Sequence, residues 1–211
     1  MRFTAVVRYL LIVSFLSTST ARADSYQVLV MGDSISAAYG LSEQEGWVHL
    51  AEQQFRERGH DVTFTNSSIS GDTTGGGLRR LPDALTRFDP DLLVIELGGN
   101  DGLRGYPPKS MQQNLQGMAE LALDHGANVL ILGMKIPSNY GPAYLKMFAK
   151  AFEEAATQSG TTLVPFFLES IAQNREYFQP DGIHPTAEAQ PLLVDYVTPY
   201  LEEFIKQPEV L

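Results

Sequence analysis

The chain of 211 residues contains no cysteine. Disulfide bonds, cysteine-ligated metal sites and thiol nucleophiles are therefore excluded. Export into an oxidising compartment would expose no thiol to oxidation. Any covalent catalysis in this protein has to use another nucleophile, and serine is the first candidate to examine.

Positive charge is also scarce. Lysine and arginine number 15 against 25 aspartates and glutamates, which gives a formal net charge of −10. The basic residues form no cluster, so nucleic acid is not an expected partner, and an anionic membrane surface would repel the protein. Beyond the N-terminal segment, no apolar stretch is long enough for a transmembrane helix, so stable membrane insertion is not expected.

Several motifs of metal, nucleotide and lipase chemistry are missing. There is no H-E-x-x-H sequence and no EF-hand loop, and the run Gly75–Gly77 lacks the lysine of a phosphate-binding loop. We therefore expect neither a metal nor a cofactor. Residues 32–36 read G-D-S-I-S, which departs from the G-x-S-x-G turn of the α/β-hydrolase fold but leaves serine chemistry open.

Residues 1–23 have the pattern of a secretory signal peptide. Arg2 and Arg8 accompany an apolar stretch at residues 9–15, and an A-x-A cleavage site ends at Ala23. The apolar stretch is too short to span a bilayer, and the alternative is an uncleaved N-terminal anchor. We predict cleavage after Ala23 and a periplasmic or secreted bacterial protein. Without its leader the chain would carry a charge of −13.

Residues 24–211 are predicted to form a single α/β domain. Five apolar runs have the length of strands and are mostly continuous, as strands covered on both faces should be. Helical patterns separate them, and this alternation predicts a doubly wound parallel sheet. The expected strands are Tyr26–Met31, Val62–Thr65, Leu92–Leu97, Asn128–Leu132 and Thr161–Val164.

The expected helices have recognisable ends. Ser42 and Glu45 form a candidate capping box that would open a helix through residue 58. Leucines at 78, 81 and 85 mark the next helix, and Gly126 and Gly160 would end two later ones. The last helix is expected over residues 187–204, with Pro191 in its first turn.

Ser34 directly follows the first expected strand, and Asp181 and His184 lie near the C-terminus. A serine nucleophile needs a base to accept its proton, and the base needs an acid to orient it. His184 is the candidate base and Asp181 the candidate acid. The alternatives are a helix-capping serine and an Asp-Gly turn that carries a surface histidine.

Gly71 and Asn100 follow the second and third expected strands, so they should lie at the same sheet edge as Ser34. The Gly71 and Ser34 N–H groups and the Asn100 amide are candidate oxyanion donors. The alternative for both new positions is an ordinary glycine- or asparagine-rich turn. Asp33 is interpreted as shaping the turn, and Glu96 as bonding to backbone or a neighbouring side chain.

Together these elements resemble the SGNH, or GDSL, hydrolase family. Gly32-Asp-Ser-Ile35 differs from the family's Gly-Asp-Ser-Leu in one residue. Within the family, the chain is most similar to the bacterial branch of thioesterase I, lysophospholipase L1 and arylesterase. The segments that carry this likeness are Ile69–Thr73, Glu96–Gly105, Pro137–Gly141, Val164–Phe167 and Asp181–Pro185.

The resemblance implies a three-layer α/β/α sandwich with a five-stranded, flavodoxin-like parallel sheet. It implies Ser34, Asp181 and His184 as catalytic residues and Ser34, Gly71 and Asn100 as oxyanion donors. Enzymes of this branch cleave acyl esters and thioesters without a cofactor. The expected substrate is therefore a small acyl ester or lipid, and the protein is expected to be a monomer.

Two other functions stay open: a carbohydrate O-deacetylase of the same superfamily, or a binding module that kept the fold without catalysis. If acyl chains are bound, we expect the loops after the third and fourth strands to hold them. Tyr106, Pro108, Ile136 and Tyr140 supply apolar surface there. The alternative is that these are ordinary rigid surface loops.

Overall fold

The computed structural model describes residues 25–205, so the expected leader at residues 1–23 lies outside the described residues. Five parallel strands form one sheet in the order β2-β1-β3-β4-β5. This is the flavodoxin-like order, which places a switch point between β1 and β3. The strands are β1 (Tyr26–Gly32), β2 (Val62–Asn66), β3 (Leu92–Glu96), β4 (Asn128–Leu132) and β5 (Thr162–Val164).

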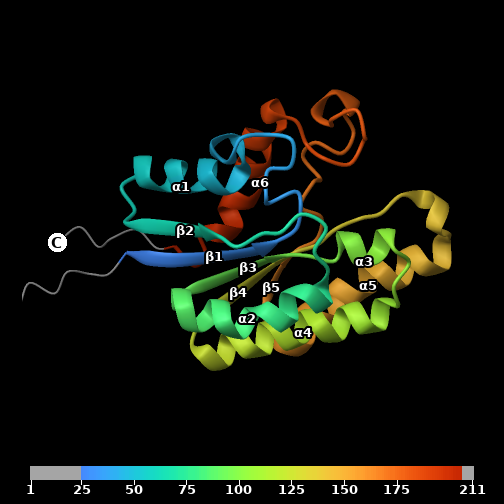
Figure 1. Cartoon of the computed structure of the whole chain (residues 1–211), viewed down its shortest axis with the longest axis horizontal. Coiled ribbons are helices and arrows are strands. Elements are labelled where there is room, and N and C mark those ends of the chain that lie inside the picture. Colours follow the sequence, from blue (N-terminus) through green and yellow to red (C-terminus); the bar gives the residue numbers. More distant parts are fainter. Residues whose placement is uncertain (1–24, 206–211) are drawn as a thin grey trace, which may run out of the picture.

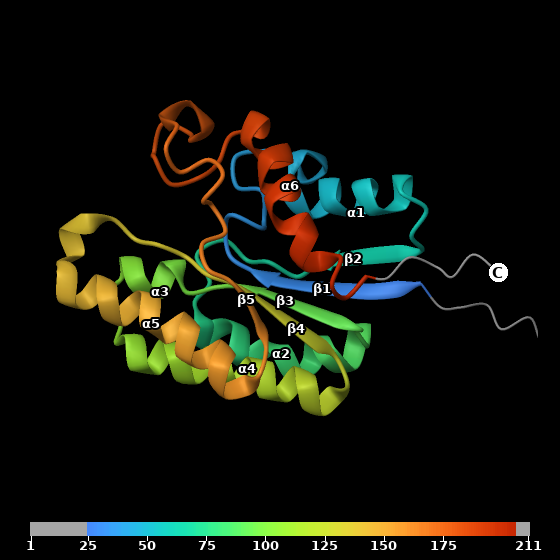
Figure 2. The ribbon, with the colours of Figure 1, turned by 180° about the vertical axis from the view of Figure 1, so that it is seen from behind.

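Helices cover both faces of this sheet, which gives the predicted three-layer sandwich (Figures 1 and 2). Two helices lie on one face: α1 (Trp47–Glu57) and α6 (Gln190–Leu201). The opposite face is covered by α2 (Thr74–Phe88), α4 (Pro108–His125) and α5 (Pro142–Ser159). A short helix, α3 (Gly99–Leu103), lies at the carboxyl edge of the sheet.

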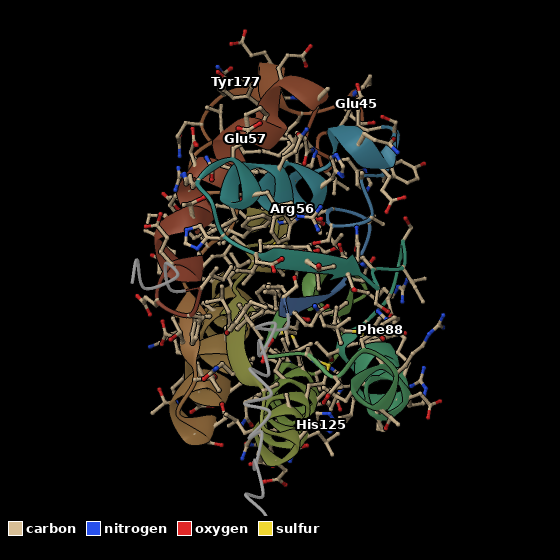
Figure 3. All side chains as sticks on the ribbon, turned by 90° about the vertical axis from the view of Figure 1, so that its left-hand side faces the viewer. Glu45, Arg56, Glu57, Phe88, His125 and Tyr177 are labelled. Atoms are coloured by element: carbon tan, nitrogen blue, oxygen red, sulfur yellow. The ribbon has the colours of Figure 1, made fainter. Side chains whose placement is uncertain are left out.

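The core lies between the sheet and these two helical layers. All five residues of β3 are buried. In the helical layer formed by α1 and α6, Trp47 and Phe55 of α1 are fully buried. Figure 3 shows side chains filling the space between the layers, with Arg56 beside β2. Its guanidinium donates to the Val62 carbonyl at 2.9 Å, which links α1 to the edge strand.

Helix α1 begins at Trp47, so the prediction of a helix from Ser42 was wrong at its start. The capping box does form, because the Ser42 N–H donates to Glu45 at 2.9 Å, but it caps a separate 3₁₀ turn at Glu43–Glu45. Gly46 is extended and separates the two helices, and a Cβ there would lie 2.8 Å from Ala38. The close approach of that neighbouring loop requires a glycine at the break.

The C-terminal helix is also shorter than predicted. A 3₁₀ turn at Ala187–Ala189 precedes α6, and Pro191 lies in the first turn of α6, as expected. No helix within residues 25–205 combines the length and the hydropathy needed to cross a bilayer. The connections that follow the carboxyl ends of the strands carry the residues described next.

Candidate active site

Ser34 lies in the tight turn that follows β1. Residues 34–39 make successive turns rather than a regular helix, and Ala38 has a positive φ of 55°. The Tyr39 N–H donates to the Ser34 carbonyl at 3.0 Å and closes the turn. Ser34 is half-buried, and its side chain is directed into a cavity at this edge of the sheet.

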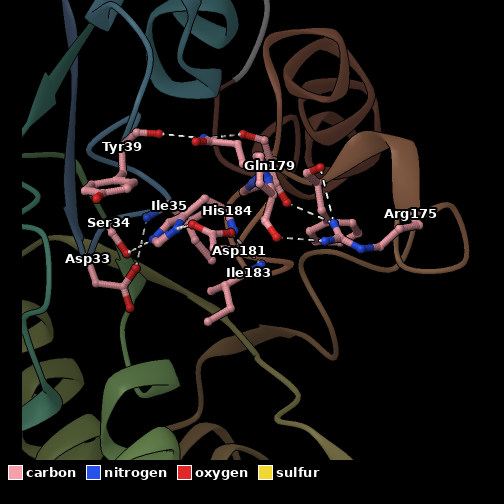
Figure 4. Close-up of polar contacts among 12 residues, drawn as sticks. Asp33, Ser34, Ile35, Tyr39, Arg175, Gln179, Asp181, Ile183 and His184 are labelled. Carbon is pink, nitrogen blue, oxygen red and sulfur yellow. Dashed lines mark hydrogen bonds and ion pairs between the residues drawn. The ribbon is translucent and has the colours of Figure 1, made fainter.

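The turn and the C-terminal loop bring together three side chains from opposite ends of the chain (Figure 4). His184 Nε2 lies 2.8 Å from Ser34 Oγ, and His184 Nδ1 lies 2.7 Å from Asp181 Oδ2. The same aspartate accepts the Ile183 and His184 N–H groups on Oδ1, at 2.9 and 3.1 Å. This geometry lets the imidazole accept a proton from serine while a carboxylate fixes its tautomer.

Hydrogen bonding keeps Asp181 ionised. The bond to His184, followed by the two backbone N–H groups, lowers the pKa of its carboxyl to about 2, against an opposing contribution from burial. The Asp181 side chain is 38% exposed, so water also reaches it. Throughout the neutral range the histidine therefore faces a carboxylate.

Two residues that the sequence analysis did not single out hold the loop of Asp181 in place. Arg175 donates to the carbonyls of Phe178, Gln179 and Pro180, at 3.3, 2.9 and 3.0 Å. Gln179 Nε2 donates to the carbonyls of Tyr39 and Pro185 at 2.7 and 3.1 Å and so ties the loop to the Ser34 turn (Figure 4). Pro180 and Pro185 bracket Asp181 and His184, but no sequence motif marks the polar anchors of this loop.

The three candidate oxyanion donors lie on the wall of one cavity together with His184. Gly71 has a φ of 78°, and within residues 25–205 neither its N–H nor that of Ser34 has an acceptor. The Asn100 amide donates one hydrogen to Asp33 at 2.9 Å, which leaves its second N–H for a ligand. Arg104 holds the Gly71 carbonyl at 2.8 Å and thereby fixes the peptide that follows it.

The cavity has a volume of about 630 Å³ and a mainly apolar wall. Ile136 lies on this wall, as expected for a residue that would contact an acyl chain. Much of the wall comes from residues that the sequence analysis did not assign to it, which include Met134, Phe166, Leu168, Ala172, Phe178 and Ile183. Five of these follow β5, in a segment without helical or strand periodicity, so no sequence pattern predicts that they share a cavity.

Tyr106, Pro108 and Tyr140, the other residues predicted to bind an acyl chain, are not among the residues that line this cavity. The Tyr140 hydroxyl instead donates to the Leu103 carbonyl at 2.7 Å, and Pro108 opens α4. Tyr106 is 45% exposed, and its carbonyl accepts a hydrogen bond from Tyr144 at 2.7 Å. These residues brace the neighbouring loops against each other.

Glu96 lies where its strand predicted, fully buried, and it bonds to backbone and a neighbouring side chain. It accepts from the Ser36 hydroxyl at 2.8 Å and from the Asp33 and Ser36 N–H groups at 3.3 and 3.2 Å. Within residues 25–205, histidine and acidic side chains form no group of three that would hold a metal ion.

Comparison with known proteins identifies the family. The model of the GDSL-like lipase/acylhydrolase family matches residues 30–191, which is more than half of the chain. The chain belongs to this family. It is therefore a carboxylic ester hydrolase with the SGNH fold.

Close relatives cover nearly the whole chain. Esterase TesA of Pseudomonas aeruginosa is 49% identical over 88% of this chain and 92% of its own length. An arylesterase of Vibrio mimicus is 44% identical over 95% of this chain and 99% of its own. The crystal structure of a psychrotrophic Pseudoalteromonas esterase, EstA, inhibited by monoethylphosphonate, is 39% identical, with a TM-score of 0.82 over 86% of this chain and 99% of that one.

Proposed function

We propose that this ester hydrolase is an exported serine esterase that cleaves acyl esters and thioesters through Ser34, His184 and Asp181. The observation that carries the proposal is the unbroken hydrogen-bonded series from Asp181 through His184 to Ser34, which ends on the wall of an apolar cavity. Each group in the series has the partner that its role needs.

Acylation would begin when Ser34 Oγ attacks the substrate carbonyl and His184 Nε2 takes the hydroxyl proton. The tetrahedral intermediate collapses when the bond to the alcohol or thiol breaks, and His184 returns the proton to that leaving group. Water then attacks the acyl-serine ester with His184 again as the base, and the products are free Ser34 and the carboxylic acid. All of these groups come from one chain, so a monomer would suffice.

The negative oxygen that forms in each half-reaction would be bound by the Ser34 and Gly71 N–H groups and the Asn100 amide. These donors bind the carbonyl oxygen and the oxyanion, and they do not contact the leaving group. This agrees with activity on esters and thioesters alike, and with the esterase and arylesterase names of the relatives.

The apolar wall favours substrates with an acyl chain over acetylated carbohydrates. An O-deacetylase would need a small acyl pocket and a polar cleft, whereas eight apolar side chains from the segments after β4 and β5 line this cavity. Each methylene buried against such a wall contributes about 0.8 kcal/mol. Catalytic efficiency should therefore rise with acyl length until the cavity is full.

This proposal predicts a chain-length preference that depends on Ile136. With p-nitrophenyl acetate, octanoate and palmitate, kcat/KM should increase from acetate to octanoate. Ile136→Asp should lower kcat/KM for octanoate about 10- to 100-fold, because the chain would be buried against an unpaired charge. The value for acetate should change less than about threefold, since acetate does not reach that wall.

Tyr106→Asp is the matched control, because Tyr106 lies in a neighbouring loop but not on the wall. It should leave the octanoate-to-acetate ratio at the wild-type value. An equal loss on both esters in Ile136→Asp would show that the cavity does not hold the chain. The same panel, extended to lysophosphatidylcholine and acyl-CoA, would identify the leaving groups that the enzyme accepts.

Export is proposed from the n-region, apolar stretch and A-x-A site at residues 1–23. Protein purified from the envelope fraction or the medium of a bacterial host should have an intact mass that begins at Asp24. A cytosolic protein that retains the arginine at position 2 would contradict both the cleavage and the location.

A further inference from the structure

The side chain of Tyr39 packs against the ring of the candidate base, His184. The two ring centroids lie 4.4 Å apart, and the ring planes are tilted by 34°. Tyr39 lies on the cavity wall together with Ser34 and His184 (Figure 4). The His184 side chain is 16% exposed, whereas Tyr39 is 52% exposed. Tyr39 therefore covers part of the imidazole and keeps much of its own surface open at the cavity.

Backbone hydrogen bonds on both sides hold Tyr39 in this place. Its N–H donates to the Ser34 carbonyl at 3.0 Å, and its carbonyl accepts from Gln179 Nε2 at 2.7 Å. The first bond closes the turn that carries Ser34, and the second ties this turn to the loop that carries His184. Tyr39 is thus fixed beside the two groups that would exchange the proton. A rigid aromatic side chain offers a large contact surface at a low entropic cost.

The order of the strands separates the two ends of a bound ester. On one side of Ser34, the segments after β4 and β5 supply the eight apolar side chains of the wall. On the other side, the segment after β2 supplies Ser70 and Gly71. An acyl chain that lies along the apolar wall extends toward β5. The leaving group is bound to the same carbonyl carbon, so it points away from the chain and toward β2.

Proton transfer places a second condition on the leaving group. Its oxygen or sulfur atom has to come within hydrogen-bonding distance of His184 Nε2, which returns the proton to it. Tyr39 meets both conditions, because it comes from the turn after β1, beside the β2 segment, and packs on the histidine ring. The atoms attached to the leaving oxygen therefore pass next to the Tyr39 ring.

We infer that the Tyr39 ring forms the leaving-group subsite and selects leaving groups that carry a planar aromatic ring. An aromatic group on the alcohol can stack on the open part of the Tyr39 ring, and such pairs stabilise more than their buried area alone accounts for. A saturated ring of the same size buries a similar area but has no π face. The inference rests on the proposed function, because a leaving group passes Tyr39 only if His184 protonates it.

Benzyl octanoate and cyclohexylmethyl octanoate are a matched pair of substrates for this inference. They share the acyl group, both release a primary alcohol, and their leaving groups differ in whether the ring is aromatic. kcat/KM reports the half-reaction in which the alcohol leaves, and each value is divided by the rate of alkaline hydrolysis of the same ester to remove differences in intrinsic reactivity. The wild type should favour the benzyl ester about 3- to 10-fold, which is the effect of one aromatic contact.

Tyr39→Leu should bring this ratio to within about twofold of one, because leucine keeps an apolar contact but has no aromatic face. Tyr39→Phe should keep the wild-type ratio, since the ring remains. Ile69→Ala is the matched control, because Ile69 is also 52% exposed and lies in the neighbouring turn after β2, but it does not line the cavity. This control should keep the wild-type ratio as well. A wild-type ratio in Tyr39→Leu would overturn the inference.

A role of Tyr39 in orienting His184 would give a different result. His184 acts in both half-reactions, but the alcohol has left before deacylation begins. The deacylation rate, measured as the steady-state rate after a burst of p-nitrophenol from p-nitrophenyl octanoate, should therefore stay within about twofold of wild type in Tyr39→Leu. An equal loss on both esters, together with slower deacylation, would show that the ring only orients the histidine, and the inference would be wrong.

A measurement on the wild type keeps the inference testable if Tyr39→Leu does not fold. An added alcohol can attack the acyl-serine ester in place of water: its oxygen bonds to the acyl carbon, His184 takes its proton, and Ser34 Oγ receives that proton as its own bond to the acyl carbon breaks. Because this step is the reverse of acylation, the alcohol occupies the leaving-group subsite. At equal concentrations, benzyl alcohol should yield about 3- to 10-fold more octanoate ester than cyclohexylmethanol.

Equal yields from the two alcohols would overturn the inference. Failure of the proposed function looks different, because Ser34→Ala would then hydrolyse both octanoate esters at the wild-type rate.

Discussion

Ser34→Ala is expected to abolish esterase activity, with a loss in kcat of about 10⁶-fold, as for other enzymes in which the nucleophile of a triad is removed. His184 Nε2 lies 2.8 Å from Ser34 Oγ, and within residues 25–205 no other hydroxyl forms a hydrogen bond with this nitrogen. A fluorophosphonate probe should label the wild type once, and peptide mapping should place the adduct on Ser34.

Ser70→Ala is the matched control, because Ser70 lies on the wall of the same cavity but bonds to neither His184 nor Asp181. It should be labelled at nearly the wild-type rate. If the Ser34→Ala variant were labelled at the wild-type rate, the assignment of Ser34 as the nucleophile would be wrong. Far-UV circular dichroism and Tm of both variants would show whether a loss reflects chemistry or folding.

The central strands β1, β3 and β4 were predictable because helices cover them on both faces, so most of their residues are buried and they read as continuous apolar runs. β4 has the predicted bounds, and β1 and β3 differ from the prediction by a single residue at one end. The start of α1 was not predictable in the same way. A capping box indicates that a helical turn begins, but the break at Gly46 depends on contact with Ala38 in the preceding turn, which forms only in the folded chain.

In the candidate site, too, some features could be predicted from the sequence and others could not. The positions of Ser34, Gly71 and Asn100 followed from strand ends, which parallel topology brings to one edge. Their catalytic roles stay predictions, although the structure brings these residues together with Asp181 and His184. Neither the Arg175 and Gln179 anchors nor the cavity wall beyond β5 could be predicted, because the backbone carbonyls and side chains involved meet only in the folded loops.

Asp181→Asn is expected to cause the second-largest loss, about 10⁴-fold in kcat, because it reverses the histidine tautomer. In the wild type, Oδ1 accepts two backbone N–H groups and Oδ2 faces His184 Nδ1. Asparagine has a single acceptor oxygen, and the two backbone donors would retain it. Its amino group then faces Nδ1, which must accept, and the proton moves to Nε2, where it blocks transfer from Ser34.

Asp181→Ala should be less harmful than Asp181→Asn, since the position is 38% exposed and water can accept the Nδ1 proton. ¹⁵N chemical shifts of His184 should show the proton on Nδ1 in the wild type and in Asp181→Ala, and on Nε2 in Asp181→Asn. Because hydrogen bonding holds the Asp181 pKa at about 2, its charge persists above that pH, and the carboxylate should not contribute to any loss of activity between pH 4 and 8. Equal activity in Asp181→Asn and wild type would show that His184 takes its orientation from elsewhere, and the Arg175–Gln179 loop would then be the structure to examine.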